Sequence, residues 1–110
     1  MNEWITVCKI DDILPETGIC ALVNNQHVAI FRPYTTNELY AISNIDPFAD
    51  ASVLSRGIIA EHNNELCVAS PLKKQRFRLK DGHCLEDESY TIAHYEVQVN
   101  QDNFVQVKVS

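Results

Sequence analysis

Cysteine and histidine are the residues of this 110-residue chain that are best suited to bind a metal or to act as nucleophiles. No two of the four cysteines have the Cys-x-x-Cys spacing of a zinc or thioredoxin-like site. Cys8, Cys20 and Cys67 lie in apolar runs and are predicted to be buried, whereas Cys84, beside His83, is predicted to carry an exposed thiol. No neighbouring base can be assigned to any cysteine, and the four histidines are scattered. We therefore predict no catalytic residue and no metal ligand.

Two proline-containing loops, residues 44–57 and 70–74, offer a different kind of site, and we refer to them as loop 1 and loop 2. Loop 1 contains the sequences Asn-Ile-Asp-Pro-Phe and Leu-Ser-Arg-Gly, and loop 2 reads Ser-Pro-Leu-Lys-Lys. Each follows a short apolar stretch that is predicted to be a strand. Paired loops of this kind can bring metal ligands from distant parts of a chain together.

The pattern of the two loops resembles that of Rieske domains. A Rieske [2Fe–2S] cluster is held by two cysteines and two histidines, which that family supplies as Cys-x-His on one loop and Cys-x-x-His on the other. The corresponding positions in this chain are Asp46, Phe48, Ser70 and Lys73. The resemblance therefore implies an all-β fold of Rieske type, a sandwich or barrel with two ligand-type loops, but without a cluster.

Longer phrases at residues 10–18, 28–34, 41–48, 53–57 and 69–77 resemble one branch of this family, the small subunits of bacterial NAD(P)H-dependent assimilatory nitrite reductases. The similarity runs from about residue 4 to residue 109. It implies a large-subunit partner that carries FAD, a [4Fe–4S] cluster and sirohaem and reduces nitrite to ammonium. No Gly-x-Gly-x-x-Gly motif and no four-cysteine set for those cofactors occurs here.

The resemblance thus favours an accessory subunit of an oxidoreductase, not catalytic alone, that acts in assembly, stability or electron-path geometry. The alternative is a ferredoxin-like electron-transfer component of an oxygenase, which the four absent ligands disfavour. A third hypothesis is a free-standing binding module for a small ligand in the vacated site.

The four vacated positions have structural explanations as well as functional ones. Asp46 and Lys73 are expected to be a solvated pair of turn residues, with a salt bridge worth about 0.2–1 kcal/mol if it is exposed. Phe48 and Ser70 are expected to fill the space that a cluster would occupy, because an empty polar pocket would be costly.

A basic stretch extends from loop 2 and is the one concentration of positive charge in an acidic chain. It comprises Lys73, Lys74, Arg76, Arg78 and Lys80. Alternation along a strand would place residues 76, 78 and 80 on one face, opposite Phe77 and Leu79. Because the loop tips dock partners in related proteins, we expect a partner surface here. The candidate residues are Asp46, Pro47, Phe48, Pro71, Lys73, Lys74 and Arg76.

Composition limits the classes of function that are open to the chain. The net charge of −6 disfavours a nucleic-acid partner, since phosphate binding needs a basic face. No apolar run approaches the roughly 20 residues of a membrane span, and no signal peptide is recognisable, so a cytoplasmic location is expected. A length of 110 residues fits one domain, residues 1–110, with a single core.

The elements that must position the loops are short strands separated by turn residues. Strands are predicted at residues 4–10, 19–23, 27–31, 39–43, 58–61, 65–69, 76–79, 93–99 and 105–109, and one helical turn within residues 49–54. Asn-Asn pairs at 24–25 and 63–64 predict tight hairpins, because asparagine tolerates positive φ. No segment has a sustained 3.6-residue period, so an all-β sandwich or barrel is predicted.

Overall fold

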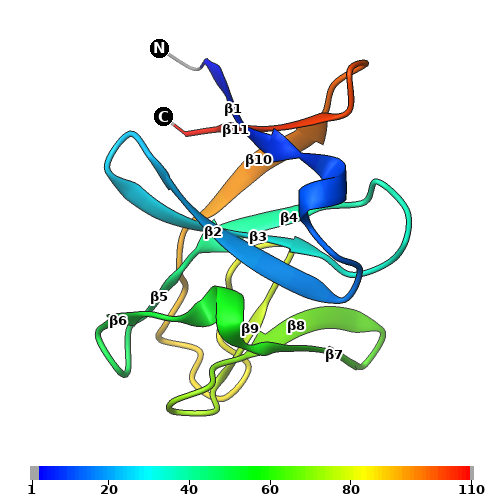
Figure 1. Cartoon of the computed structure of the whole chain (residues 1–110). Helices are drawn as coiled ribbons and strands as arrows, with labels where there is room; N and C mark the ends of the chain where they lie inside the picture. The colour runs from blue at the N-terminus through cyan, green and yellow to red at the C-terminus, as the bar shows by residue number, and fades with distance from the viewer. Residues whose placement is uncertain (1–2, 110) are drawn as a thin grey trace.

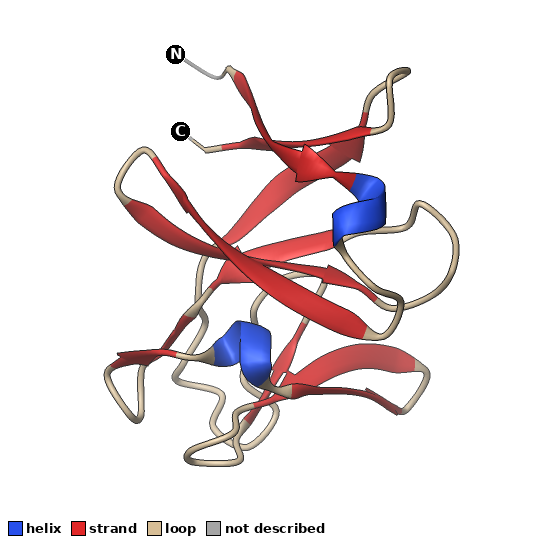
Figure 2. Ribbon diagram, in the orientation of Figure 1, coloured by secondary structure: helices blue, strands red, loops and turns tan. Residues whose placement is uncertain are grey.

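The computed structural model describes residues 3–109, and the regular secondary structure of this part is almost entirely antiparallel strands joined by turns and loops (Figures 1 and 2). The larger sheet has the order β1-β11-β10-β4-β3-β2. Its strands are β1 (Trp4–Lys9), β11 (Phe104–Lys108), β10 (His94–Val99), β4 (Tyr40–Ser43), β3 (Gln26–Arg32) and β2 (Thr17–Val23). One 3-10 turn, η1 (Ile10–Asp12), follows β1.

The second part of the fold carries both loops. A three-stranded sheet has the order β7-β8-β9, built from β7 (Ile58–His62), β8 (Glu65–Ala69) and β9 (Arg76–Arg78). A two-stranded ribbon pairs β5 (Ile45–Asp46) with β6 (Ala51–Ser52), and the 3-10 turn η2 (Leu54–Arg56) follows it. This part lies at the opposite end of the molecule from β1 and β11 (Figure 1).

Two apolar clusters hold these parts together. One packs within the larger sheet and includes Val28, Ile30, Val105 and Val107. The other lies between the two sheets and comprises Ala29, Phe31, Ile42, Leu54, Val68, Phe77, Leu79 and Cys84. Because β3 and β4 both contribute residues to both clusters, the burial of these two strands couples the larger sheet to the loop-bearing part.

The predicted hairpins are confirmed. Asn24 and Asn25 have φ values of 48° and 65°, and Asn63 and Asn64 have 51° and 65°. Positive φ at both central residues is the requirement of the tight turn whose twist matches antiparallel strands. The predicted strands are found with their ends shifted by one or two residues, and the all-β fold class is confirmed.

Two local predictions are wrong. Residues 49–54 do not form a helical turn: Ala51 and Ser52 form β6, and the only helical turn nearby is η2, which begins at Leu54. The exposed cysteine is Cys20, not Cys84, which is completely buried in the cluster between the sheets. Cys84 is drawn inward by an isolated β-bridge to Phe77, whereas the alternation of β2 turns Cys20 outward.

Loop 1 is folded back on itself by the buried Asn44. The Asn44 carbonyl accepts hydrogen bonds from the amides of Val53 and Leu54, at 2.9 and 3.0 Å. Its side-chain Oδ1 accepts a third from the Ser55 amide at 2.6 Å. A helix over residues 49–54 would need the amides of Val53 and Leu54 for its own hydrogen bonds. Because Asn44 accepts from them instead, the helix does not form and η2 begins at Leu54.

Gly57 then seats the end of loop 1 against β8. A Cβ atom at this position would lie 2.2 Å from the Ala69 carbonyl oxygen, so only glycine allows the two backbones to approach so closely. The Leu-Ser-Arg-Gly turn is therefore explained by packing: Leu54 is buried and Gly57 provides the clearance. No helix among residues 3–109 is long and apolar enough to cross a membrane.

Candidate functional site

The two loops meet at a buried hydrogen bond between Asp46 and Ser70. Asp46 is 0% exposed and Ser70 is 2% exposed. The Ser70 hydroxyl donates to Asp46 Oδ2, and the amide of Phe48 donates to Asp46 Oδ1 at 2.9 Å. The Leu72 amide in turn donates to Ser70 Oγ at 3.3 Å. One carboxylate and one hydroxyl therefore join loop 1 to loop 2 and order the backbone on both sides of the junction.

The expected solvated pair of Asp46 and Lys73 is not found. Asp46 is buried and its carboxylate is satisfied by Ser70 and by a backbone amide. Lys73 is exposed, and it takes part in no ion pair between residues that the structure describes. The burial arises because β5 places Asp46 directly beside the start of loop 2. The two segments are far apart in the sequence, so this proximity could not be predicted from it.

Phe48 lies half-buried at the rim of this junction. Its ring centroid is 4.4 Å from that of Tyr90 and 6.2 Å from that of Phe77. The ring thus covers the edge of the cluster between the sheets and remains partly accessible. Ser70 fills interior space, whereas Phe48 forms part of the surface.

The residues at the four ligand positions do not fit a Rieske cluster. Asp46 and Ser70 offer oxygen atoms that bond to each other, Phe48 offers no ligand atom, and Lys73 carries an exposed ammonium group. A Rieske centre needs two thiolates and two imidazoles at these positions. Within residues 3–109 no group of three or more His, Cys, Asp or Glu side chains is arranged to hold a metal ion.

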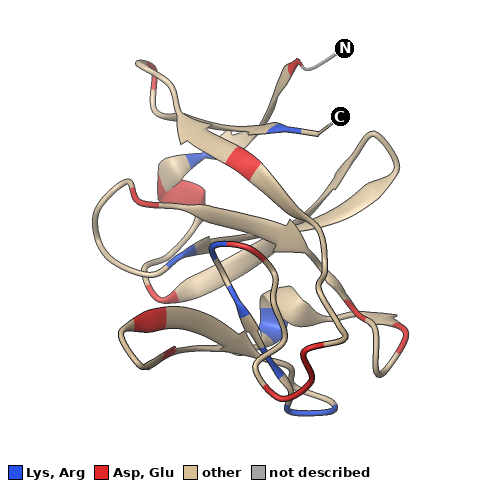
Figure 3. Cartoon of the chain, turned by 180° about the vertical axis from the view of Figure 1, so that it is seen from behind, with Lys and Arg blue, Asp and Glu red and all other residues tan. Residues whose placement is uncertain are grey.

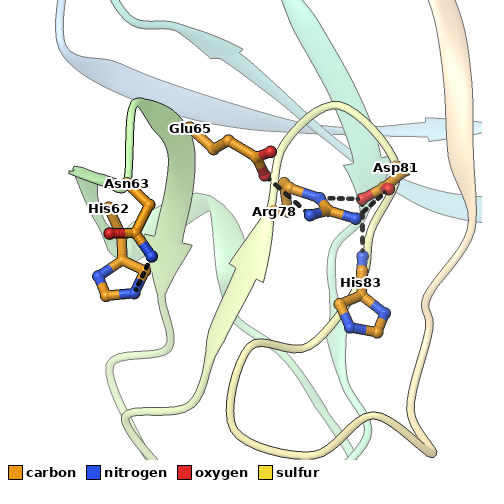
Figure 4. A network of polar contacts seen from close by, with 6 residues as sticks. All are labelled: His62, Asn63, Glu65, Arg78, Asp81 and His83. Atoms are coloured by element: carbon orange, nitrogen blue, oxygen red, sulfur yellow. Dashed lines mark hydrogen bonds and ion pairs between the residues drawn. The ribbon is translucent and has the colours of Figure 1, made fainter.

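Most of the basic stretch is neutralised within the chain. Arg76 Nε lies 2.6 Å from a Glu86 carboxylate oxygen, and the Arg76 amide donates to the same side chain at 2.7 Å. Arg78 pairs with Glu65 at 2.8 Å and with Asp81 at 2.6 Å (Figure 4). Basic and acidic segments accordingly lie side by side at this end of the molecule (Figure 3).

These ion pairs lie on the outer face of the small sheet. The strand register pairs Arg78 with Cys67, so the two side chains lie on the same face of the sheet. Cys67 is only 1% exposed on this face. Phe77 points the other way, into the core, as the predicted alternation required. The hydrogen bond from Arg78 is the main cause that lowers the pKa of Asp81 to about 2. Because Arg76 is likewise paired, with Glu86, its guanidinium is less available to a partner than the sequence suggested.

The exposed cations without an ion pair at this end, among the described residues, are Lys73, Lys74 and Arg56. Sequence reasoning identified the two lysines but missed Arg56, although it lies in the Leu-Ser-Arg-Gly turn. Lys74 has a φ of 66°, and its amide donates to the Ser70 carbonyl at 3.1 Å, so loop 2 is a tight turn that presents both lysines. The structure thus brings cations from both loops to one end.

Comparison with known proteins shows which family and which individual proteins this chain is similar to. The family described as the Rieske-like [2Fe-2S] domain matches residues 3–108. The nitrite reductase (NADH) small subunit of Escherichia coli K12 is 63% identical over 108 residues, which are 98% of this chain and 99% of that protein. An NMR structure of the Escherichia coli protein NirD superposes with a TM-score of 0.93 at 62% identity, covering 100% of this chain and 99% of that chain.

Two further relatives bear on the function. The nitrite reductase [NAD(P)H] large subunit of Klebsiella oxytoca is 35% identical over 98 residues, which are 89% of this chain but 10% of that protein. The ferredoxin of carbazole 1,9a-dioxygenase from Nocardioides aromaticivorans superposes with a TM-score of 0.82 at 24% identity, covering 97% of this chain and 98% of that chain. The second likeness shows the shared fold alone, so the oxygenase alternative is not favoured.

The loop junction generates a first prediction. Asp46→Ala leaves the buried Ser70 hydroxyl without its acceptor, and we expect the free energy of unfolding to fall by about 1–3 kcal/mol. Ser70→Ala should cost a similar amount, and the double variant should cost less than the sum, with a coupling energy of about 1–2 kcal/mol. Urea denaturation measures all four proteins. Strictly additive losses would contradict a direct bond between the two side chains.

The misfit of the ligand positions generates a second prediction. Anaerobic reconstitution with iron and sulfide should leave the wild-type chain colourless. The matched variant carries Asp46→Cys, Phe48→His, Ser70→Cys and Lys73→His, and it should take up iron because the four Rieske ligand types then stand at the loop positions. Stoichiometric iron with visible absorbance in the wild type would contradict the prediction.

The Arg78–Asp81 pair generates a third prediction, on acid stability. Because the pKa of Asp81 is lowered to about 2, the pair stabilises the fold fully above the unfolded-state pKa of about 3.9 and loses this effect as the pH falls towards 2. Wild type should therefore lose more thermal stability than Asp81→Asn between pH 5 and pH 3. The exposed Glu88→Gln variant is the control and should follow wild type. Parallel pH profiles for wild type and Asp81→Asn would show that the pair is not formed in solution.

Proposed function

Because the chain belongs to the Rieske-like [2Fe-2S] domain family and, within it, to the nitrite reductase small subunits, we propose that it is the cluster-free partner of a nitrite reductase large subunit. The observation that carries the proposal is the match to the Escherichia coli small subunit at 63% identity over nearly the full length of both chains. The chain is thus a component of an oxidoreductase, and it supplies no catalytic residue of its own.

The Klebsiella oxytoca relative supports the choice of partner. There, a region similar to this chain makes up 10% of the large subunit itself. A module that is covalently attached in one organism and separate in another must find its partner by diffusion in the second case. The separate chain therefore needs a surface that binds the large subunit without the help of a linker.

The large subunit would carry the redox cofactors, which the family resemblance gives as FAD, a [4Fe–4S] cluster and sirohaem, and it would reduce nitrite to ammonium with NAD(P)H. The small subunit would contribute to assembly, stability or the geometry of the electron path. The buried Asp46–Ser70 bond supports such a structural role, since it keeps the loop tips ordered without a metal. The four free cysteines agree with the reducing cytoplasm as the location.

The partner surface would be the loop end, where Pro47, Phe48 and Pro71 are accessible and Lys73 and Lys74 extend from loop 2. Asp46 would act on this surface only indirectly, by fixing the loop, because it is buried. Arg76 would lie at its border with its charge balanced by Glu86. Exposed charges of this kind mainly raise the association rate and make binding sensitive to salt.

A fourth prediction tests the function and its surface together. The purified chain should bind the large subunit, and Lys73→Glu with Lys74→Glu should weaken binding about tenfold or more at low salt. The difference should shrink at moderate salt because screening removes long-range attraction. The control, Lys9→Glu with Lys80→Glu, makes the same charge change at exposed sites outside loop 2 and should bind like wild type.

The two outcomes that contradict this prediction are different. If the wild-type chain forms no complex with the large subunit, the proposed function is wrong. If wild type binds and the loop 2 double variant binds equally well at both salt concentrations, the interface lies elsewhere on the chain.

A further inference from the structure

We propose that a groove beside loop 2 binds an extended segment of the large subunit that carries an apolar side chain next to carboxylates. The groove, which we call the side groove, has a volume of about 410 Å³. It is lined by Arg56, Gly57, Ile58, Ala69, Ser70, Pro71 and Lys74. The proposal rests on the function proposed above and specifies which chemistry of the partner this chain recognises.

The apolar residues that line the side groove are accessible. Ile58 is 76% exposed, more than any other large hydrophobic residue that the structure describes. It lies directly opposite Ala69 in the strand register, and Pro71, two residues after Ala69, lines the same groove. Single exposed apolar residues are common on protein surfaces, but a cluster of them in a concavity marks a binding site more strongly. An apolar side chain of the partner would bury Ile58 here.

The rim of the side groove is cationic. Arg56 and Lys74 come from different loops, and neither forms an ion pair with a residue in the described part of the chain. The contrast with Arg76 and Arg78 is informative, because both of those are neutralised by carboxylates of this chain. In a protein with a net charge of −6, two unpaired cations beside one apolar groove favour the binding of a segment that carries carboxylates.

The backbone around the side groove favours an extended occupant. β7 begins at Ile58 and is the edge strand of its sheet, because β8 is its only neighbour in the order β7-β8-β9. The outer edge of β7 therefore has amide and carbonyl groups that another strand can pair with. Addition of a strand to an exposed edge is a recurrent way to bind peptides, with side-chain pockets giving the specificity.

The walls of the side groove are fixed before any partner arrives. Gly57 packs against the Ala69 backbone and donates its amide to the Leu54 carbonyl at 2.9 Å. The Ser70 hydroxyl donates a hydrogen bond to Asp46, and the Lys74 amide donates one to the Ser70 carbonyl. A groove that needs no rearrangement loses less conformational entropy when a ligand binds. The hydrogen bonds that replace the cluster thus also shape the binding surface.

The test compares two groove variants with two matched controls in titrations against the large subunit. Arg56→Glu reverses a groove cation, and Ile58→Glu places a charge on the apolar lining. Lys80→Glu makes a charge reversal outside the groove, and Leu22→Glu changes an apolar residue that is 66% exposed on β2. Each groove variant should raise the Kd about tenfold or more, whereas the controls should stay within about twofold of wild type. Unchanged thermal midpoints check the fold of all four variants.

Hydrogen exchange supplies a second measurement that does not depend on a variant. In the wild-type complex, the amides of β7 should exchange more slowly than in the free chain, because the bound segment pairs with this edge. If wild type binds the large subunit but Arg56→Glu and Ile58→Glu bind equally well, the groove inference is wrong and the proposed function stands. If wild type does not bind at all, the proposed function itself fails.

A second copy of this chain is the competing occupant. Sedimentation of the isolated protein distinguishes it, since self-association that Ile58→Glu abolishes would assign the groove to a homodimer and overturn the inference. A monomer at the concentrations used for the titrations agrees with the proposal.

Discussion

The hydrogen bond between Asp46 and Ser70 is the interaction on which the loop end depends. A buried carboxylate is costly unless donors satisfy it, and here a hydroxyl and a backbone amide do so. Rieske proteins hold the equivalent loops through a cluster with thiolate and imidazole ligands. In this chain two oxygen-bearing side chains join the loops, so the paired-loop architecture is kept while the four ligand positions carry none of the Rieske ligand types.

The same end of the molecule depends on a second set of constraints in loop 1. Asn44 ties the loop to η2, and Gly57 allows close packing on β8. These roles explain the Leu-Ser-Arg-Gly turn without reference to a partner. The argument for docking therefore rests on what the turn leaves accessible, namely Arg56 and Ile58, rather than on the presence of the turn itself.

The distribution of charge also indicates that docking depends on the groups that the fold leaves accessible. A stretch that reads as continuously basic is divided by the fold into two parts with different roles. Arg76 and Arg78 cover the outer face of the small sheet and are neutralised there by acidic residues. Lys73 and Lys74, joined by Arg56 from the other loop, remain available to a partner. Exposed ion pairs contribute little to stability, so the uncompensated cations are the more informative feature.

The sequence by itself determined the all-β class, the hairpins at Asn24–Asn25 and Asn63–Asn64, and the mismatch at the four ligand positions. These features depend on residues that are close in sequence: φ at a turn, alternation along a strand, and the side-chain type at each position. Only the tertiary structure decided that Asp46 is buried, that Cys84 and not Cys20 lies in the core, and that Arg56 meets Lys74 at one groove. Burial and ion pairing depend on which distant segments the sheets bring together, and local patterns in the chain do not encode that proximity.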